Sequence, residues 1–400
     1  MILMQLSFKE LQYVVGTPEI VENMKNVHAL RPFDDRVIAF LNDLSQELRK
    51  TREYPDVATF GFWCRKAALL QEKEKYDDVA DRFGKGVVFH STPSNVPVNF
   101  AFSFAAGLLA GNANIVRLPG KPFEQVNIIC DAINRLLADR WQEMAPYIVF
   151  VKFPPVKEIT DTFSALCNVR VIWGGDMTVA ELRNSKIPAR TTEITFADRH
   201  SIAVINADAY LAAERKDTIV QNFYNDTYYT DQNACTSPRI IFWMGEKTEE
   251  AKQDFWGRVH ALVAEKYQLS PVQAVGKLNA FYSVAAVKPV KRVDAEDMFV
   301  TRVHTDSSDS ELMNYKYNSG FFFEQDIRNL DEIQGVCDIR CQTLTYYGVP
   351  KEAFKAFLDA CRPIGIDRIV PIGKSMDFAL VWDGYDLIRQ MSRKVTIIGA

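Results

Sequence analysis

The spacing of the apolar residues changes near residue 86. Before that point they recur at helical intervals, as in VIAFLNDLSQELRK, where Val37, Phe40, Leu41 and Leu44 would share one face of a helix. After it, short continuous apolar runs alternate with amphipathic segments. Such runs predict buried strands. We expect these strands at 86–90, 114–118, 147–153, 169–173 and 200–206.

The segments between these runs predict helices. Their expected ranges are 97–110, 123–139, 156–166 and 176–185. The clearest is 123–139, which carries its apolar residues on one side and follows Pro122 at the position where a first turn tolerates proline. Strands and helices that alternate in this way form a parallel sheet covered on both faces, so we expect an α/β fold. Ligands bind such sheets beyond the carboxyl ends of the strands.

A second region follows residue 206. It begins with an aromatic helical segment, and the pattern then predicts a strand at 239–243 and a long amphipathic helix at 248–267. The stretch 281–335 is mixed in pattern, and two further strands are expected at 368–372 and 378–382. The change of pattern places a domain boundary near residue 207.

Composition narrows the class of protein. The 400 residues are 48% hydrophobic and 24% charged, and 47 Lys plus Arg stand against 51 Asp plus Glu, a net charge of −4. This balance is typical of a soluble globular protein and excludes a strongly basic nucleic-acid binder. The longest apolar run, 99–110, is shorter than the roughly 20 residues of a bilayer span. With no secretory signal pattern at the N-terminus and seven scattered cysteines, we expect a cytoplasmic protein without a membrane span.

The segment HSTPSNVPVNF could carry chemistry, because it follows a predicted strand and leads into a predicted helix. Its prolines and small polar residues make a rigid, solvated turn at the end of the sheet where ligands bind. Asn95 offers an uncharged amide donor suited to stabilising an oxyanion. The alternative is an ordinary turn in which Ser94 or Asn95 caps the helix.

Two further turns lie at the ends of predicted strands. Arg117 and Lys121 bracket a Pro-Gly turn, where cations beside a helix start would suit a phosphate or a ribose, although solvated surface charge is the alternative. Gly174 and Gly175 in WGGD would let the backbone approach a diphosphate, although Gly-Gly turns are common. The chain has neither a GxGxxG dinucleotide fingerprint nor a P-loop.

Cys235 is the one thiol in a polar loop, in TDQNACTSPR directly before a predicted strand. That setting favours a working thiolate. Four cysteines fall in apolar helical segments and are expected to be inert. Cys337 and Cys341 lie one helical turn apart without a histidine partner, and the five histidines show no ligand spacing, so we expect no metal site.

Together these segments resemble one family, the LuxC-type acyl-CoA reductases (long-chain fatty acyl reductases), a branch of the aldehyde dehydrogenase superfamily. The resemblance covers roughly residues 80–400. It is strongest in HSTPSNVPVNFAFSFAAGLLAGNANIVRLP, WGGD, DQNACTSPR and DRIVPIGKSMDFALVWDGYDLIRQMSRKV.

The resemblance implies a Rossmann-like cofactor domain without the usual glycine fingerprint and a second α/β domain that carries the nucleophile. The domains would be 1–206, with a helical N-terminal segment and the cofactor site, 207–372, with the nucleophile, and 373–400, a return segment joining them. The likeness also implies a homo-oligomer and an acyl-activating protein partner.

The roles of single residues follow from the same likeness. Cys235 matches the family's nucleophile, and Asn95 matches the asparagine that forms the oxyanion hole with the Cys235 N–H. The cofactor site would be made by a lining turn, a basic residue near the adenosine ribose or its phosphate, and a glycine turn near the diphosphate. These residues are Ser91, Thr92, Pro93 and Ser94, then Arg117, then Gly174 and Gly175.

The implied reaction is reduction of an acyl-CoA, or of a carrier-bound acyl thioester, to the aldehyde by NADPH through an acyl-cysteine; NADH stays open as the cofactor. Hydrolytic aldehyde dehydrogenases carry a Glu-Leu-Gly-Gly stretch whose glutamate activates water. The comparable stretch here, TEITFADRHS, has Glu193 but lacks the motif. Two alternatives remain: a hydrolytic aldehyde dehydrogenase that uses NAD(P), and a non-catalytic acyl-transfer partner in a multienzyme complex.

Overall fold

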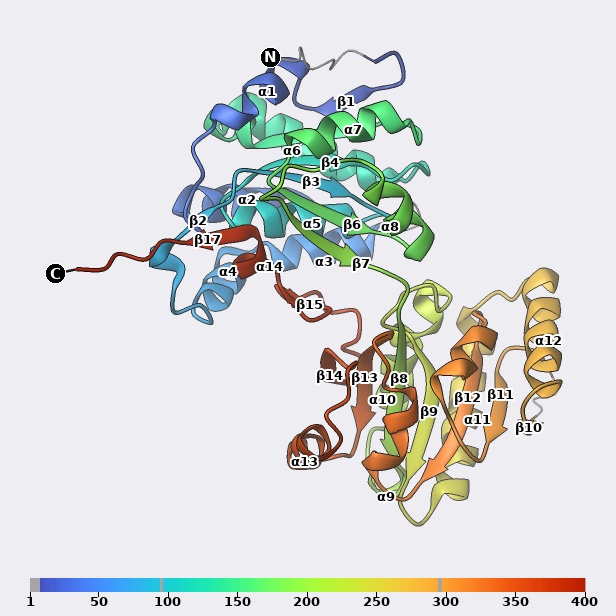
Figure 1. Ribbon diagram of the computed structural model, residues 1–400. Coiled ribbons are helices and arrows are strands. Elements are labelled where there is room, and N and C mark those ends of the chain that lie inside the picture. The colour runs from blue at the N-terminus through green and yellow to red at the C-terminus, as the bar shows by residue number, and fades with distance from the viewer. Residues whose placement is uncertain (1–7, 94–95, 294–296, 400) are drawn as a thin grey trace. The chain divides into compact units, whose positions relative to one another are not determined.

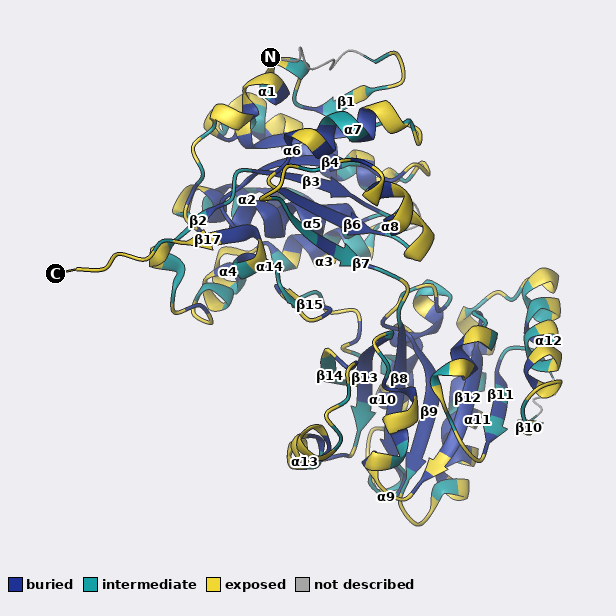
Figure 2. Ribbon diagram, in the orientation of Figure 1, coloured by how far each residue is buried: buried dark blue, intermediate teal, exposed yellow. Residues whose placement is uncertain are grey.

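The computed structural model describes residues 8–93, 96–293 and 297–399. Contacts within the chain divide it into two compact units (Figure 1). The first comprises residues 1–197 with 378–400, and the second comprises 198–377. Figure 2 shows that the central strands of both sheets are buried, whereas many exposed residues lie on the outer helices.

The first unit is built on a six-stranded sheet in the order β1-β5-β4-β3-β6-β7. All of its neighbouring strands pair in parallel except β1, which is antiparallel to β5. The strands are β1 (Gln12–Val15), β3 (Val87–Ser91), β4 (Ala113–Arg117), β5 (Ile148–Lys152), β6 (Val169–Trp173) and β7 (Thr192–Phe196). The first four parallel strands and the helices between them confirm the predicted α/β pattern.

The helices of this sheet lie on its two faces. They are α5 (Asn99–Leu109), α6 (Glu124–Asp139), α7 (Lys157–Leu166) and α8 (Asp176–Arg183). The strand order runs outward from β3 to β5 and then returns through β6 to β7. Because parallel crossovers are right-handed, α5 and α6 cover one face, and α7 and α8 cover the other. The order therefore reverses between β3 and β6, which is where open α/β sheets bind ligands.

Segments from both ends of the chain complete the first unit. The N-terminal helices are α1 (Pro18–Asn23), α2 (Asp35–Leu48), α3 (Pro55–Trp63) and α4 (Lys66–Lys73). The C-terminal elements are β15 (Val381–Trp382), β16 (Tyr385–Asp386), α14 (Leu387–Met391) and β17 (Ser392–Lys394), the last paired with β2 (Arg82–Gly84). The strand expected at 378–382 is therefore reduced to two residues, because β15 pairs only with the short β16.

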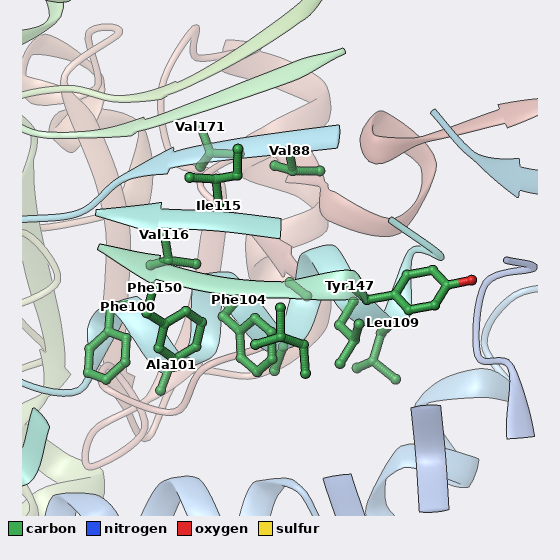
Figure 3. Packing of buried hydrophobic residues seen from close by; sticks show 14 of the residues in the cluster. Val88, Phe100, Ala101, Phe104, Leu109, Ile115, Val116, Tyr147, Phe150 and Val171 are labelled. Atoms are coloured by element: carbon green, nitrogen blue, oxygen red, sulfur yellow. The ribbon is translucent and has the colours of Figure 1, made fainter. Parts of the chain in front are cut away.

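The core of the first unit forms because these strands are apolar on both faces. Phe100 and Phe104 of α5 meet Phe150 of β5 edge to face, with ring centroids 5.8 and 4.9 Å apart (Figure 3). Val116 on β4 belongs to the same cluster. Aromatic pairs in this geometry add about 0.5–1.5 kcal/mol each beyond the burial of their area.

The second unit is built on a seven-stranded sheet in the order β10-β11-β12-β9-β8-β13-β14, parallel except at β10. Its strands are β8 (His200–Asn206), β9 (Pro238–Met244), β10 (Val290–Val293), β11 (Thr301–Thr305), β12 (Phe321–Ile327), β13 (Cys341–Tyr347) and β14 (Arg368–Pro371). Its helices are α9 (Ala207–Leu211), α10 (Lys216–Asp226), α11 (Thr248–Lys266), α12 (Pro271–Ala285) and α13 (Lys351–Cys361). Separate apolar clusters cover the two faces of the sheet.

Short 3₁₀ helices connect several of these elements. They are η1 (Met24–Asn26), η2 (Val79–Asp81), η3 (Gln142–Tyr147), η4 (Tyr228–Thr230), η5 (Ser310–Tyr315) and η6 (Leu330–Val336). In the described part of the chain, no helix has both the length and the apolar character needed to cross a bilayer.

The division between the units differs from the sequence-derived boundaries at 207 and 373. Strand β8, expected at the end of the first domain, is a central strand of the second unit's sheet, because β9 and β13 hydrogen-bond to its two edges. Strand β7, which the apolar pattern did not predict, closes the first sheet. Its sequence TEITF mixes polar and apolar residues because β7 is an edge strand.

His90 links β3 to α5 in the first unit through buried hydrogen bonds. Its Nδ1 lies 2.8 Å from Ser103 Oγ, and its Nε2 lies 3.0 Å from Asn114 Oδ1. Asn114 Nδ2 donates to Asn112 O, so Oδ1 accepts from His90, and Trp173 Nε1 donates to Ser103 Oγ. Burial lowers the pKa of His90 from 6.5 to about 4, so the imidazole is neutral at pH 7.

His90 predicts a loss of stability in acid. The unfolded chain binds the proton near pH 6.5 and the folded chain only near 4, so the stability from neutral His90 is present above pH 6.5 and is lost as the pH falls towards 4. When the pH falls from 7 to 4.5, the free energy of unfolding should fall by about 2–3 kcal/mol less in His90→Gln than in the parent. Urea denaturation at the two pH values measures this difference. The exposed His28 supplies the control, His28→Gln, which should follow the parent. Equal losses in all three proteins would contradict this role.

Candidate active site

The sequence-predicted lining turn lies at the carboxyl end of β3. Ser91 is the last residue of that strand, and Pro93 follows in the turn. Thr92 Oγ1 donates to Arg117 O at 2.5 Å and so ties the turn to the end of β4. Ser94 and Asn95 lie outside the described residues, so the oxyanion role of Asn95 stays a prediction.

Arg117 lies at the carboxyl end of β4, partly buried. Its Nη2 donates to Phe153 O at 3.3 Å, and its Cζ lies 4.6 Å from the centre of the Phe153 ring. Burial lowers the pKa of its guanidinium from the ordinary value. These contacts hold the side chain in place and leave further N–H donors for a ligand.

A pocket of about 270 Å³ adjoins Arg117. It lies between the start of α7 and the body of α8, with Val156 and Leu182 as apolar wall residues. Thr160, Thr178 and Glu181 add polar groups, and Arg117 adds a positive charge. Only three of the ten lining residues are apolar, so the pocket suits a polar ligand such as a base joined to a sugar.

The Gly-Gly turn leads from β6 into α8, next to the same pocket. Gly175 is the N-cap residue of α8, and Gly174 N donates to Phe196 O at 3.1 Å. A Cβ on Gly174 would lie 2.9–3.0 Å from the Thr178 side chain, so the turn has no room for a larger residue. The first turn of α8 lies at the reversal of strand order, and a helix start in that setting favours phosphate.

Glu193 on β7 is held in an ion pair. Arg170 Nε donates to its carboxylate at 2.8 Å and Arg183 Nε at 2.8 Å. Although burial by itself would raise the pKa of Glu193, hydrogen bonds from Arg183 and Arg170 hold that pKa below the ordinary value. A carboxylate held by two guanidinium groups is a poor base for activating water.

Cys235 lies in the second unit, in the loop that joins η4 to β9, and its side chain is exposed. Its carbonyl oxygen accepts a hydrogen bond from Ser201 Oγ at 2.7 Å, and Ser201 Oγ accepts one from Thr343 N at 3.2 Å. Ser201 is on β8 and Thr343 is on β13, so the loop is anchored at the amino ends of the central strands. In the first unit, by contrast, the candidate residues lie at the carboxyl ends of the strands.

The turn before Cys235 has an unusual backbone. Asp231 and Gln232 have φ angles of +51° and +52°, the left-handed region that costs non-glycine residues about 1–2 kcal/mol each. Tyr267 Oη donates closely to the Asp231 carboxylate, and Gln273 Nε2 donates to it at 3.1 Å. These contacts offset the cost and fix the turn.

The buried side chain of Gln232 ties this turn to the sheet. Its Oε1 accepts from Gly320 N at 2.7 Å and from Phe321 N at 3.2 Å. Its Nε2 donates to Pro238 O at 3.3 Å and to Phe321 O at 3.4 Å. One amide therefore joins the Cys235 loop to the first residues of β9 and β12.

One further contact of this loop was not foreseen from the sequence. Thr236 Oγ1 donates to the Met376 thioether at 3.2 Å. The segment that carries Met376 is held by Asp226, whose carboxylate accepts from Gly373 N at 2.6 Å and Ser375 Oγ at 2.8 Å. The segments DQNAC and PIGKSM are neighbours in the fold. No local sequence pattern predicts this, because 140 residues separate Thr236 from Met376.

In the described parts of the chain, no group of three or more His, Cys, Asp or Glu residues is arranged to hold a metal ion. The buried thiols are Cys64, Cys130, Cys167, Cys337 and Cys341, and Cys361 is partly exposed. Burial raises the pKa of Cys130 and Cys167 to about 12, so these two thiols are unreactive at neutral pH.

More than half of the chain matches a known family. Residues 64–291 match the family model described as acyl-CoA reductase (LuxC). The chain belongs to the LuxC family. Two curated proteins named long-chain acyl-protein thioester reductase are each 24% identical to it, from Vibrio harveyi over 339 residues and from Photorhabdus laumondii over 329. Each alignment covers 79% of this chain and 64% of the relative, so this LuxC chain spans less than two thirds of the length of the relatives that it matches.

Solved aldehyde dehydrogenases share the fold. The NAD-dependent benzaldehyde dehydrogenase of Corynebacterium glutamicum matches with a TM-score of 0.64 at 13% identity, over 94% of this chain and 88% of that one. The lactaldehyde dehydrogenase of Escherichia coli matches with a TM-score of 0.62 at 11% identity, over 95% and 88%. These likenesses confirm the aldehyde dehydrogenase-like α/β fold that the sequence predicts for this LuxC-family chain.

The Gln232 contacts predict a cost when the side chain is replaced. Gln232→Leu keeps the size but leaves the N–H groups of Gly320 and Phe321 without their acceptor. We expect the free energy of unfolding to fall by about 2–4 kcal/mol, measured by chemical denaturation. Gln253→Leu, an exposed glutamine on α11, is the control and should change it by less than about 0.5 kcal/mol. A Gln232 variant as stable as the control would refute the anchoring role.

Proposed function

We propose that the protein reduces a long-chain acyl thioester, on CoA or on a carrier protein, to the aldehyde with a nicotinamide cofactor. The observation that carries this proposal is the exposed Cys235 in an anchored loop of a LuxC-family chain. The curated relatives are named for reduction of a long-chain acyl-protein thioester. The first unit would bind the dinucleotide, and the second unit would carry the nucleophile.

In the proposed reaction the Cys235 thiolate attacks the thioester carbonyl carbon. The carbon–sulfur bond to CoA or the carrier breaks, and the departing thiolate takes up a proton. The product of this step is an acyl group on Cys235. The Cys235 N–H and, by the family likeness, Asn95 would stabilise the oxyanion, where each donor typically contributes about 100- to 1,000-fold in rate.

The residues at the reversal of strand order fit a nicotinamide dinucleotide. Arg117 and the pocket beside it would take the adenosine end, and the start of α8 after Gly174 and Gly175 would take the diphosphate. When bound, the reduced cofactor supplies the hydride that converts the acyl group to the aldehyde. Loss of the aldehyde returns Cys235 to the thiolate. We infer NADPH as the cofactor because Arg117 offers a cation for the 2′-phosphate.

Reduction is favoured over hydrolysis by the state of Glu193. In a hydrolytic enzyme a carboxylate takes a proton from the water that attacks the acyl-cysteine. Glu193, the candidate from the sequence, is engaged by Arg170 and Arg183. The homo-oligomer, the acyl-activating partner and the cytoplasmic location expected from the sequence stay predictions.

The nucleophile predicts a covalent adduct. After mixing with saturated acyl-CoAs of graded chain length and no nucleotide, the parent should gain the mass of one acyl group, located on Cys235 by peptide mapping. Cys235→Ala should lose the adduct and lower thioester-dependent NADPH oxidation by at least about a thousandfold. Cys361→Ser removes the other thiol that reaches the surface and should keep both.

Two results would contradict this proposal. An adduct that persists in Cys235→Ala would place the nucleophile elsewhere. If neither acyl-CoA nor acyl-carrier thioesters give aldehyde with either nucleotide, the reductase assignment is wrong. A biological activity that survives Cys235→Ala would instead favour the non-catalytic acyl-transfer role.

The cofactor site predicts a change in nucleotide affinity. Arg117→Ala should weaken NADPH binding by about 10- to 100-fold, because a charge-assisted hydrogen bond contributes about 1.5–3 kcal/mol. Lys121→Ala, the exposed cation of the same turn, should change it by less than about threefold. Quenching of tryptophan fluorescence measures both. A greater loss for NADPH than for NADH would assign Arg117 to the 2′-phosphate, and unchanged affinity for both nucleotides would exclude it from the site.

A further inference from the structure

Arg170 is a buried cation that contacts two of the residues lining the pocket beside Arg117. It lies on β6 and is 2% exposed, and the register of the sheet sets it opposite Glu193 on β7. Its Nε donates to the Glu193 carboxylate at 2.8 Å, and its Nη2 donates closely to the same carboxylate. The buried charge therefore has a charged partner, and the third nitrogen, Nη1, is left for other acceptors.

The Nη1 atom of Arg170 joins the two helices that form the walls of this pocket. It donates to Leu182 O at 2.9 Å and to Ser185 O at 2.8 Å. Both of these residues line the pocket, at the end of α8 and directly after it. Nη1 also donates to Ser164 Oγ at 3.3 Å, and Ser164 lies on α7, one turn after the lining residue Thr160. A single nitrogen therefore fixes the end of α8 against α7.

Glu193 holds the end of α8 a second time. Arg183, the last residue of α8, donates through its Nε to the other carboxylate oxygen, Oε1, at 2.8 Å. Carbonyl groups in the last turn of a helix lack partners within the helix, and Arg170 supplies a donor there. Removal of the carboxylate would leave the buried charge of Arg170 unpaired, so the guanidinium would have to shift. The walls of the pocket would move with it.

We propose that Arg170 and Glu193 are positioning residues that set the gap between α7 and α8, and thereby the affinity of the pocket for the adenosine end of the nucleotide. The inference deepens the proposed function and rests on it for the identity of the ligand. Val156 at the start of α7 and Leu182 on α8 face the pocket as apolar wall residues. A widening of about 0.5–1 Å already forfeits a quarter to a half of a dispersion contact. Glu193 thus serves nucleotide binding in place of water activation.

The test is the affinity for adenosine 2′,5′-bisphosphate, measured by isothermal titration calorimetry on the folded chain. This probe has no nicotinamide, so its binding is independent of turnover. Glu193→Gln keeps the size of the side chain and removes its charge. We expect it to weaken binding by about tenfold or more, because removal of a group that orients a binding residue commonly costs about 10- to 100-fold.

Glu324→Gln is the matched control. Glu324 on β12 is 1% exposed, and its Oε2 lies 3.2 Å from Arg302 Nη1, so this variant breaks a buried ion pair in the second unit. It should lower the stability as Glu193→Gln does and leave the affinity unchanged within about twofold. Glu193→Asp keeps the charge but is shorter by one methylene, so its affinity should lie between those of the parent and Glu193→Gln.

Steady-state kinetics separate positioning from loss of stability. Glu193→Gln should raise the KM for NADPH by the same factor as it weakens binding of the probe. Its kcat at saturating NADPH should change by less than about twofold, because the altered contact is equally present before and during the reaction. A purely structural role would reduce the amount of active enzyme and so lower kcat, without a change in KM.

The proposal is overturned if Glu193→Gln and Glu324→Gln bind the probe equally well. If Glu193→Gln does not fold, Glu193→Asp decides, and an affinity equal to that of the parent overturns the proposal. A parent that binds no adenosine nucleotide overturns it together with the proposed cofactor site. If the affinity falls as expected but no acyl thioester is reduced, the positioning role stands and the proposed function fails.

Discussion

The candidate nucleophile depends on the hydrogen bonds that anchor a strained turn to the start of a sheet. Two consecutive non-glycine residues in the left-handed region would not persist in a free loop. The Gln232 side chain forms hydrogen bonds with four backbone groups, and the Arg239 guanidinium donates to the Gln232 carbonyl oxygen. A side chain carried by such a turn has few conformations to lose when it reacts, which favours a defined line of attack.

The candidate residues follow the carboxyl ends of strands in the first sheet, whereas in the second sheet they precede the amino end of a strand. In the first unit the candidate cofactor groups follow the carboxyl ends of β3, β4 and β6, where strand order reverses. In the second unit Cys235 precedes β9 at its amino end. In the proposed function, a nucleotide phosphate would suit the N–H groups at a helix start, and the nucleophile would suit a rigid loop.

The charges around Glu193 fit acyl transfer and reduction better than hydrolysis. Glu193, the candidate base from the sequence, forms ion pairs with Arg170 and Arg183. An acyl-cysteine in these surroundings would therefore persist until it is reduced or passed to another thiol.

The sequence by itself determined the alternating α/β pattern and the buried strands of the first sheet, because apolar periodicity is a local signal. A polar loop before a strand is also a local signal, and it made Cys235 the candidate nucleophile, which stays a prediction. It did not predict β7, whose polar residues belong to a sheet edge, or place β8 in the second sheet. Those outcomes depend on which strands hydrogen-bond across long separations in the chain. The same reason hides the anchoring contacts of Gln232 and Arg239: a buried amide or guanidinium acquires its role only from neighbours that the tertiary structure brings to it.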